Sequence, residues 1–363
     1  MRILITGNLG YLGTGVVMQL RTAFPEATLI GYDMAYFASS ASNSSVLPEK
    51  SLDEQVYGDV RNMPAEVLDG VDAVVHLAAL PEDLLGQKYD SITKDVNYTA
   101  TIRMAELAKA VGVEAFVFAS TCSMYGAAEE SDVSEFSDLN PISNHAAAKL
   151  QAELDLEPLA GDGFSITCLR FPTACGMSDK PRLGLLLNDM VAEAITTGSV
   201  RVSATNNYWQ PLLHVQDMAR AIEWAVTRDI AHGGEYLIIN AGSNSWNFRT
   251  HDLGQAVAEA IPGTMLHFTD DEVADNRSYK VNFDLFKALA PNHQPLYTLT
   301  EAIAEMRNGL SAKMLNSDNA GELQLNRLLA LNKLEEQGLL DHQLRWAHQR
   351  IVSDRELALE LLD

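Results

Sequence analysis

The sequence predicts an α/β fold built around a parallel sheet. Strand-like apolar runs alternate along the chain with longer helix-like runs, which is the pattern of such folds. A glycine-rich turn joins the first strand to the first helix, and an acidic residue ends the second strand. The 363 residues, 47% of them hydrophobic, suffice for one large domain or two smaller ones.

The first strand–turn–helix unit is RILITGNLGYLGTGVVMQL. Arg2–Thr6 is predicted as a short apolar strand, and Gly7, Gly10 and Gly13 precede an apolar helix. Glycines here let the backbone turn sharply and approach a pyrophosphate, while the helix N-terminus offers N–H groups and a positive dipole end. Glycines also make ordinary turns, but their place between strand and helix favours phosphate binding.

The second strand, ATLIGYD, ends at Asp33, twenty residues after Gly13. A carboxylate at this point accepts hydrogen bonds from the adenosine ribose hydroxyls and would repel a 2′-phosphate. No Arg or Lys follows until Lys50. The segment therefore favours NAD over NADP, with a simple strand-end turn as the structural alternative.

Further strands follow at α/β spacing. Asp72–Leu80 and Ala115–Thr121 are predicted as buried parallel strands, separated by the helical stretch TATIRMAELAKAVG with its glycine stop. The stretch YGDVRN, between the strand that ends at Asp33 and the strand Asp72–Leu80, is expected to place Asp59 and Val60 beside the adenine.

Composition excludes several function classes. A net charge of −23 and a pI of about 4.7 disfavour nucleic acid and anionic membranes as partners. Cys122, Cys168 and Cys175 form no CxxC pair and are interpreted as buried thiols, and no histidine spacing indicates a metal site. Without a signal peptide or an apolar run of roughly 20 residues, a cytoplasmic protein is expected.

In order and spacing, these motifs resemble the extended short-chain dehydrogenase/reductase family, the NAD-dependent epimerase/dehydratase group, which acts mostly on nucleotide sugars. The matching segments extend to Asp284 and include TGNLGYLG, GDV, HLAA, DVNYTAT, FASTCSMYG, LRFPTACG, LLHVQDMARA and NRSYKVNFD. The resemblance implies a Rossmann-type doubly wound parallel sheet that binds NAD, beneath a smaller, discontinuous α/β substrate-binding domain.

The expected domains follow from this resemblance. Residues 1–170 would form the Rossmann domain, with 205–240 returning to it. Residues 171–204 and 241–312 would form the smaller domain, and 313–363 a C-terminal helical extension. A homodimer is expected.

The resemblance also implies site residues. Those that would bind the cofactor are Gly7, Asn8, Leu9, Gly10, Tyr11, Leu12, Gly13, Asp33, Asp59, Val60, Leu77, Ala78, Ala79, Asn97, Lys149 and Pro172. The catalytic set would be Thr121, His145 and Lys149, and the substrate set Gln210 and Arg277. Tyr125 and His214 are interpreted as structural.

Two positions depart from the family pattern. His145 stands where the family has its catalytic tyrosine, and Gln210 stands where it often has an arginine that clamps a substrate diphosphate. An imidazole, with an ordinary pKa of about 6.5, can act as a base at neutral pH, and the lysine charge would push that pKa down. It is shorter than a phenol, so it would reach substrate through a water or after a shift. Alternatively, His145 is a polar placeholder, or Thr121 or a small-domain residue transfers the proton.

The C-terminal region lies beyond the resemblance. Leu325, Leu328 and Leu329 have helical spacing, and Gly338 is a plausible stop. The stretch SDREL, from Ser353, fits a capping box of a last short helix. These helices are expected to pack on their own protomer, with a role in oligomerisation as the alternative.

The leading hypothesis is an NAD-dependent epimerase/dehydratase-like enzyme that acts on a sugar or nucleotide sugar by transient hydride transfer to bound NAD. The alternatives are a non-catalytic NAD-binding sensor or scaffold and a simple NAD-dependent dehydrogenase.

Overall fold

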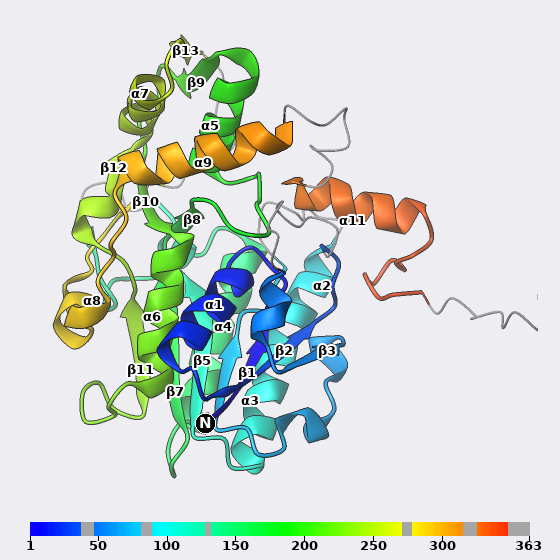
Figure 1. The fold of residues 1–363 in the computed structure, drawn as a ribbon. Coiled ribbons are helices and arrows are strands. Elements are labelled where there is room, and N and C mark those ends of the chain that lie inside the picture. The colour runs from blue at the N-terminus through cyan, green and yellow to red at the C-terminus, as the bar shows by residue number, and fades with distance from the viewer. Residues whose placement is uncertain (38–46, 81–88, 128–131, 271–277, 315–324, 348–363) are drawn as a thin grey trace, which may run out of the picture.

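The computed structural model describes residues 1–37, 47–80, 89–127, 132–270, 278–314 and 325–347. Its central element is a seven-stranded parallel sheet in the order β11-β7-β5-β4-β1-β2-β3 (Figure 1). The strands are β1 (Arg2–Thr6), β2 (Thr28–Asp33), β3 (Glu54–Tyr57), β4 (Ala73–His76), β5 (Ala115–Thr121), β7 (Ser165–Phe171) and β11 (Tyr236–Asn240). The strand order reverses between β1 and β4, which creates a crevice at the carboxyl ends of the strands. The predicted doubly wound sheet is confirmed.

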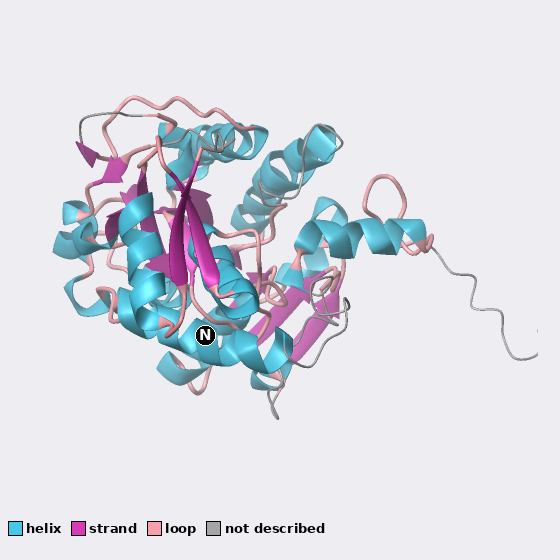
Figure 2. Cartoon of the chain, turned by 90° about the horizontal axis from the view of Figure 1, so that it is seen from above, coloured by secondary structure: helices cyan, strands magenta, loops and turns pink. Residues whose placement is uncertain are grey.

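Helices cover both faces of this sheet (Figure 2). On one face lie α1 (Gly13–Ala23) and α6 (Val215–Thr227), and on the other α3 (Ala100–Ala110) and α4 (Asn144–Leu156). Side chains of β1 alternate between them. Ile3 and Ile5 pack in the core with α1 and α6, while Leu4 packs in the core with α3 and α4. The continuous apolar run of β1 is therefore buried on both sides.

A smaller unit lies at the carboxyl end of the central strands (Figure 1). Its sheets are β8 (Thr173–Cys175), β10 (Trp209–His214) and β12 (Asn247–Arg249); β9 (Ser199–Ser203) and β13 (Met265–Thr269); and β6 (Asp132–Val133) and β14 (Lys280–Val281). Its helices are α5 (Leu186–Thr197), α7 (Thr250–Ala260) and α9 (Leu299–Met314). Helix α8 (Asp284–Leu289), expected in the smaller domain, instead packs against the large sheet, because Phe286 is buried in that core against Trp224 of α6. Within the segment 205–240, β10 pairs with β8 of the small sheet, whereas α6 and β11 belong to the large one.

The C-terminal region contributes one described helix, α11 (Arg327–Glu336). Asn326 caps it, because its side chain accepts the Leu329 N–H at 3.2 Å, and Gly338 follows its end with a φ of +69°. The predicted helix and its glycine stop are confirmed. Leu331 and Leu344 are buried in the core beside α3. Ser353, with the predicted last helix, lies outside the described residues.

Three further expectations concern burial and composition. Cys122, Cys168 and Cys175 are buried free thiols, as predicted. Among the described residues, no helix is both long and apolar enough to cross a membrane. In the same part of the chain, no group of three or more His, Cys, Asp or Glu side chains is placed to hold a metal ion.

Candidate functional site

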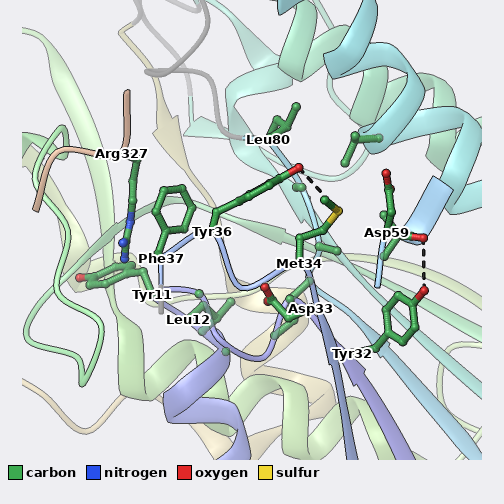
Figure 3. Close-up of a pocket in the computed structure, with 18 of the residues that line it drawn as sticks. Tyr11, Leu12, Tyr32, Asp33, Met34, Tyr36, Phe37, Asp59, Leu80 and Arg327 are labelled. Atoms are coloured by element: carbon green, nitrogen blue, oxygen red, sulfur yellow. Dashed lines mark hydrogen bonds between the residues drawn. The ribbon is translucent and has the colours of Figure 1, made fainter. Parts of the chain in front are cut away.

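The loop between β1 and α1 forms the floor of a cavity of about 290 Å³ (Figure 3). Gly7 has a φ of +72°, and a Cβ on it would lie 2.7 Å from the Ala78 nitrogen. A Cβ on Gly13 would lie 2.3 Å from the Gly7 carbonyl oxygen. Only glycine fits either position, so the backbone itself forms the wall. We call this space the glycine-loop cavity.

Most residues predicted to bind the cofactor line the glycine-loop cavity. They are Gly7, Gly10, Tyr11, Leu12, Gly13, Asp33, Asp59, Val60, Leu77, Ala78 and Ala79. The cradle of backbone at the start of α1 suits a pyrophosphate, and the carboxylate of Asp33 suits a ribose. The glycine-loop cavity therefore has a backbone surface that suits a pyrophosphate and a carboxylate that suits a ribose, two groups of a dinucleotide that need polar partners.

Asp33 is fixed at the end of β2 by two backbone donors. Its carboxylate accepts the N–H of Leu9 at 3.1 Å and of Ala35 at 2.7 Å. Burial raises the pKa of Asp33, while these two bonds and the charges of Lys180 and Arg327 act to lower it. Two cations from distant segments thus act on Asp33, although none follows it closely in sequence.

Three predicted cofactor residues act behind the cavity wall. The Asn8 side chain donates to Gln55 Oε1 at 2.6 Å, and Leu9 uses its N–H on Asp33. Asn97, fully buried, bonds the backbone of Leu80 with both ends of its amide, at 2.8 Å each. None of the three lines the glycine-loop cavity, so their contribution is to position the residues that do.

A second cavity of about 740 Å³ adjoins the first between the two domains, and we call it the His145 cavity. Its volume is that of a small-molecule site. Five predicted residues line it without lining the first cavity: Thr121, His145, Lys149, Pro172 and Gln210. It shares wall residues with the glycine-loop cavity, namely Leu12, Leu77, Ala79, Ala174, Arg182 and Met218. The two cavities are therefore parts of one continuous site.

His145 lies in the first turn of α4. Ser143 caps this helix through its hydroxyl, which accepts the Ala146 N–H at 3.2 Å. His145 Nδ1 lies 3.0 Å from the Leu80 carbonyl oxygen and 3.1 Å from Asn97 Nδ2. The first contact suits a protonated Nδ1 and the second an unprotonated one, so the surroundings support either tautomer.

Lys149 lies one turn further along α4 and is buried. Its ammonium donates to the Ala119 carbonyl at 2.7 Å and lies 4.3 Å from the centre of the Phe118 ring. Burial lowers the pKa of Lys149 to about 7. Thr121, at the end of β5, accepts the Ser123 N–H at 3.1 Å through its hydroxyl oxygen. Both side chains are thus held by backbone on the floor of the His145 cavity.

Two arginines in the His145 cavity were not predicted. Arg182 lies in the wall that the two cavities share, and Arg201 on β9 pairs with Glu193 at 2.5 Å. No motif marks them, and Arg201 lies on β9, which pairs with β13 from a distant part of the chain. The predicted Arg277 lies outside the described residues.

Tyr125 and His214 line neither cavity, and their contacts agree with the structural interpretation. The Tyr125 hydroxyl donates to Asn240 Oδ1 at 2.7 Å and accepts from Arg170 at 3.0 Å. The His214 ring stacks on Tyr297 with 3.7 Å between ring centres.

The adenosine end of the glycine-loop cavity also has walls that were not predicted. Asp59 forms an ion pair with Arg61 at 2.6 Å, and both line the cavity. Arg327 and Leu344 of the C-terminal region line it as well. Apolar spacing in that region indicated a helix but could not show which surface it covers.

Comparisons with known proteins agree with this geometry. A sequence model of the NAD dependent epimerase/dehydratase family matches residues 3–242. UDP-glucuronic acid decarboxylase 1 of Arabidopsis thaliana is 26% identical over 330 residues, which cover 88% of this chain and 72% of the relative. A UDP-glucose 4-epimerase of Azospirillum brasilense is 28% identical over 296 residues, which cover 72% of this chain and 79% of the relative.

Solved structures share the fold. UDP-glucose-4-epimerase from Stenotrophomonas maltophila, with bound NAD and formylated UDP-arabinopyranose, superimposes with a TM-score of 0.75. It is 20% identical, and the match covers 87% of this chain and 100% of that one.

Proposed function

Because the chain belongs to the NAD dependent epimerase/dehydratase family, we propose that it epimerises, or eliminates a group from, a nucleotide sugar held in the His145 cavity. The observation that carries this proposal is the shared wall between the cavities. A dinucleotide laid along the glycine loop has its reactive end at this wall. NAD, when bound, accepts a hydride from a sugar carbon and can return it.

His145 is the proposed proton-transfer group. With Nδ1 donating to the Leu80 carbonyl, Nε2 is an acceptor that takes the proton of a substrate hydroxyl. The resulting imidazolium keeps its Nδ1–H on the Leu80 carbonyl and carries on Nε2 the proton that it gives back to the sugar oxygen. One imidazole thereby serves both halves of a reversible cycle, which supports an enzyme over a sensor that has lost its reaction.

Lys149 and Thr121 support this proton transfer. In this proposal Lys149, which lines the same cavity, contributes charge beside His145 and binds the nicotinamide ribose. The Thr121 hydroxyl is a further hydrogen-bonding group for the reacting sugar oxygen. Pro172 lines the same cavity and is the proposed neighbour of the nicotinamide carboxamide.

The proposed substrate class rests on charge and on the relatives. Arg182 and Arg201 line the His145 cavity of a protein whose net charge is −23, and the pairing of Arg201 with Glu193 offsets part of its charge. Arginine suits a diphosphate because its guanidinium can donate two parallel hydrogen bonds. The names of the relatives refer to UDP-sugars. Gln210 can add a neutral hydrogen bond where the family often has an arginine.

The test is a panel of UDP-, dTDP- and GDP-sugars, incubated with the NAD-loaded full chain and followed by NMR of the sugar. Conversion of at least one member with no net reduction of NAD supports the proposal. Net formation of NADH points instead to a simple dehydrogenase. Binding of NAD with no conversion of any bound nucleotide sugar points to the non-catalytic alternative.

Assembly and location complete the proposal. The homodimer and the cytoplasmic location expected from the sequence stand as parts of it. Light scattering of the purified chain and fractionation of expressing cells test the two separately.

A further inference from the structure

The C-terminal segment 325–347 closes one side of the glycine-loop cavity. The Tyr36 hydroxyl donates to the Leu344 carbonyl, and Arg61 Nη1 donates to the Gln343 carbonyl at 2.8 Å. The Trp346 indole N–H donates to the Met34 carbonyl at 2.6 Å. Tyr36, Arg61 and Met34 all line the cavity, so the segment is bonded directly to its wall.

The same segment connects both domains. Leu325 is buried in the core of the smaller domain, whereas Leu331, Leu340 and Leu344 are buried in the core of the larger one. The Leu183 N–H also donates to the Leu325 carbonyl at 3.0 Å. Because residues at both ends of segment 325–347 are buried in a core, the residues between them are held over the glycine-loop cavity.

Arg327 is the charged residue that this segment brings to the cavity. It is 3% exposed, and its guanidinium lies 4.2 Å from the centre of the Phe37 ring. Its Nη2 donates to the Lys180 carbonyl at 3.0 Å. In Figure 3 the side chain points to Phe37 and Tyr11, on the glycine-loop side, while Asp59 and Tyr32 lie at the opposite end.

We propose that Arg327 binds the phosphates of the dinucleotide and that segment 325–347 thereby completes the cofactor site. The glycine loop and α1 supply backbone donors to the same phosphates, and a planar guanidinium adds charge-assisted bonds. Stacking on Phe37 holds the guanidinium plane in place. The charge of Arg327 also acts to lower the pKa of Asp33, the proposed ribose ligand, although burial raises that pKa overall.

This role goes beyond the family assignment. The matched family region ends at residue 242, well before Arg327. The proposal concerns cofactor binding alone, so it stands whether or not His145 transfers a proton.

The experiment compares Arg327→Gln with Arg345→Gln in the full chain freed of bound dinucleotide. Arg345 is the matched control, because it lies on the same segment but does not line the glycine-loop cavity. ADP-ribose, which carries the phosphates, is titrated by calorimetry, and adenosine, which lacks them, by NMR. Arg327→Gln is expected to weaken ADP-ribose binding about 10- to 100-fold, the worth of a charge-assisted hydrogen bond, and to leave adenosine binding unchanged. Arg345→Gln is expected to change neither.

Other outcomes overturn the proposal. Equal weakening of both ligands by Arg327→Gln would mean that Arg327 only supports the shape of the cavity. Equal weakening of ADP-ribose by both variants would mean that the general charge of the segment is responsible. If Arg327→Gln does not fold, Arg327→Lys keeps the charge without the planar fork. It is expected to weaken ADP-ribose binding by a smaller factor, again without an effect on adenosine, and unchanged ADP-ribose binding in that variant would refute a bidentate contact.

Discussion

Lys149 is a buried amine on the floor of a cavity, and its protonation is coupled to folding. Its pKa falls from the ordinary 10.5 to about 7 in the folded protein because burial disfavours the ammonium. Between these values the unfolded chain binds more protons at this site than the folded one. The contribution of Lys149 to the free energy of unfolding therefore rises with pH in this window and is flat below it.

This linkage gives the first prediction. Without cofactor, the free energy of unfolding of the wild type, minus that of Lys149→Met, should increase between pH 7 and pH 10. The expected slope is up to about 1.4 kcal/mol per pH unit. Urea unfolding of both proteins across this range measures it. A difference that stays constant would show that the amine is hydrated in the folded protein.

Asp33 lines the cavity where a ribose-binding carboxylate was expected, but the charges around it differ from those expected. The sequence indicated that no cation stands near it, yet the fold brings the charges of Lys180 and Arg327 to bear on it. Lys180 forms an ion pair with Glu49 at 3.4 Å, which reduces what it offers to a 2′-phosphate. The sequence near Asp33 could not reveal these two cations, because they come from segments far away along the chain.

The second prediction concerns this carboxylate. Wild-type protein should prefer NAD to NADP, and Asp33→Asn should relax the preference by binding NADP more tightly and NAD more weakly. Removing the negative charge lets Lys180 and Arg327 act on the 2′-phosphate without opposition. Calorimetric titrations of both dinucleotides measure the ratio. If the variant keeps the wild-type ratio, Asp33 does not discriminate between them.

Among the elements, the glycine loop is where sequence and structure agree most closely. The strand Arg2–Thr6 was predicted with the bounds that β1 has, and the glycines lie where the backbone is too crowded for a Cβ. The strand predicted at Asp72–Leu80 is shorter in the structure, ending at His76, because the chain then turns to form the cavity wall. Local pattern therefore predicted the four strands of the large sheet that are clear apolar runs, β1, β2, β4 and β5, but not β3, β7 or β11.

The smaller domain was predicted only as a domain, not strand by strand. Its strands β8 and β12 have three residues each, too few to show a period of two. Their pairing partners lie far away in the sequence, as for β9 with β13. Separation along the sequence also explains the outcome for α11. Its apolar spacing predicted a helix, but not that the helix would lie over the glycine-loop cavity.

Crowding at the glycine loop gives the third prediction. Gly13→Ala should weaken NAD binding and lower stability, by about 1–3 kcal/mol for overpacking, because the new Cβ meets backbone at 2.3 Å. Gly15→Ala on the same helix is the control. There the nearest atom is a Gln216 side-chain oxygen at 3.2 Å, which can move, and alanine favours the helix. Thermal unfolding and NAD titration of both variants test the contrast, and an equal effect of the two would contradict it.

At the scale of the whole molecule, the shared wall couples the two ligands. A dinucleotide in the glycine-loop cavity forms part of the surface that a nucleotide sugar contacts in the His145 cavity. The fourth prediction is that NAD increases the affinity for UDP-sugars several-fold and that UDP-sugars increase the affinity for NAD by the same factor, as linkage requires. Calorimetry in both orders of addition measures the factor. Independent binding would show that the cavities do not meet in solution.

The measurement that tests the account most directly is the rate of conversion of a nucleotide sugar by NAD-loaded wild type, His145→Ala and His145→Tyr. If His145 transfers the proton, we expect His145→Ala to convert the sugar more slowly by roughly 10² to 10⁴, the usual contribution of a positioned proton-transfer group. Its affinity for NAD should be unchanged. Because Nδ1 is fitted to Leu80 and Asn97, His145→Tyr should also lose activity, since a phenol cannot reproduce both contacts. Full activity in His145→Ala would contradict the account and move the proton transfer to Thr121 or to the smaller domain.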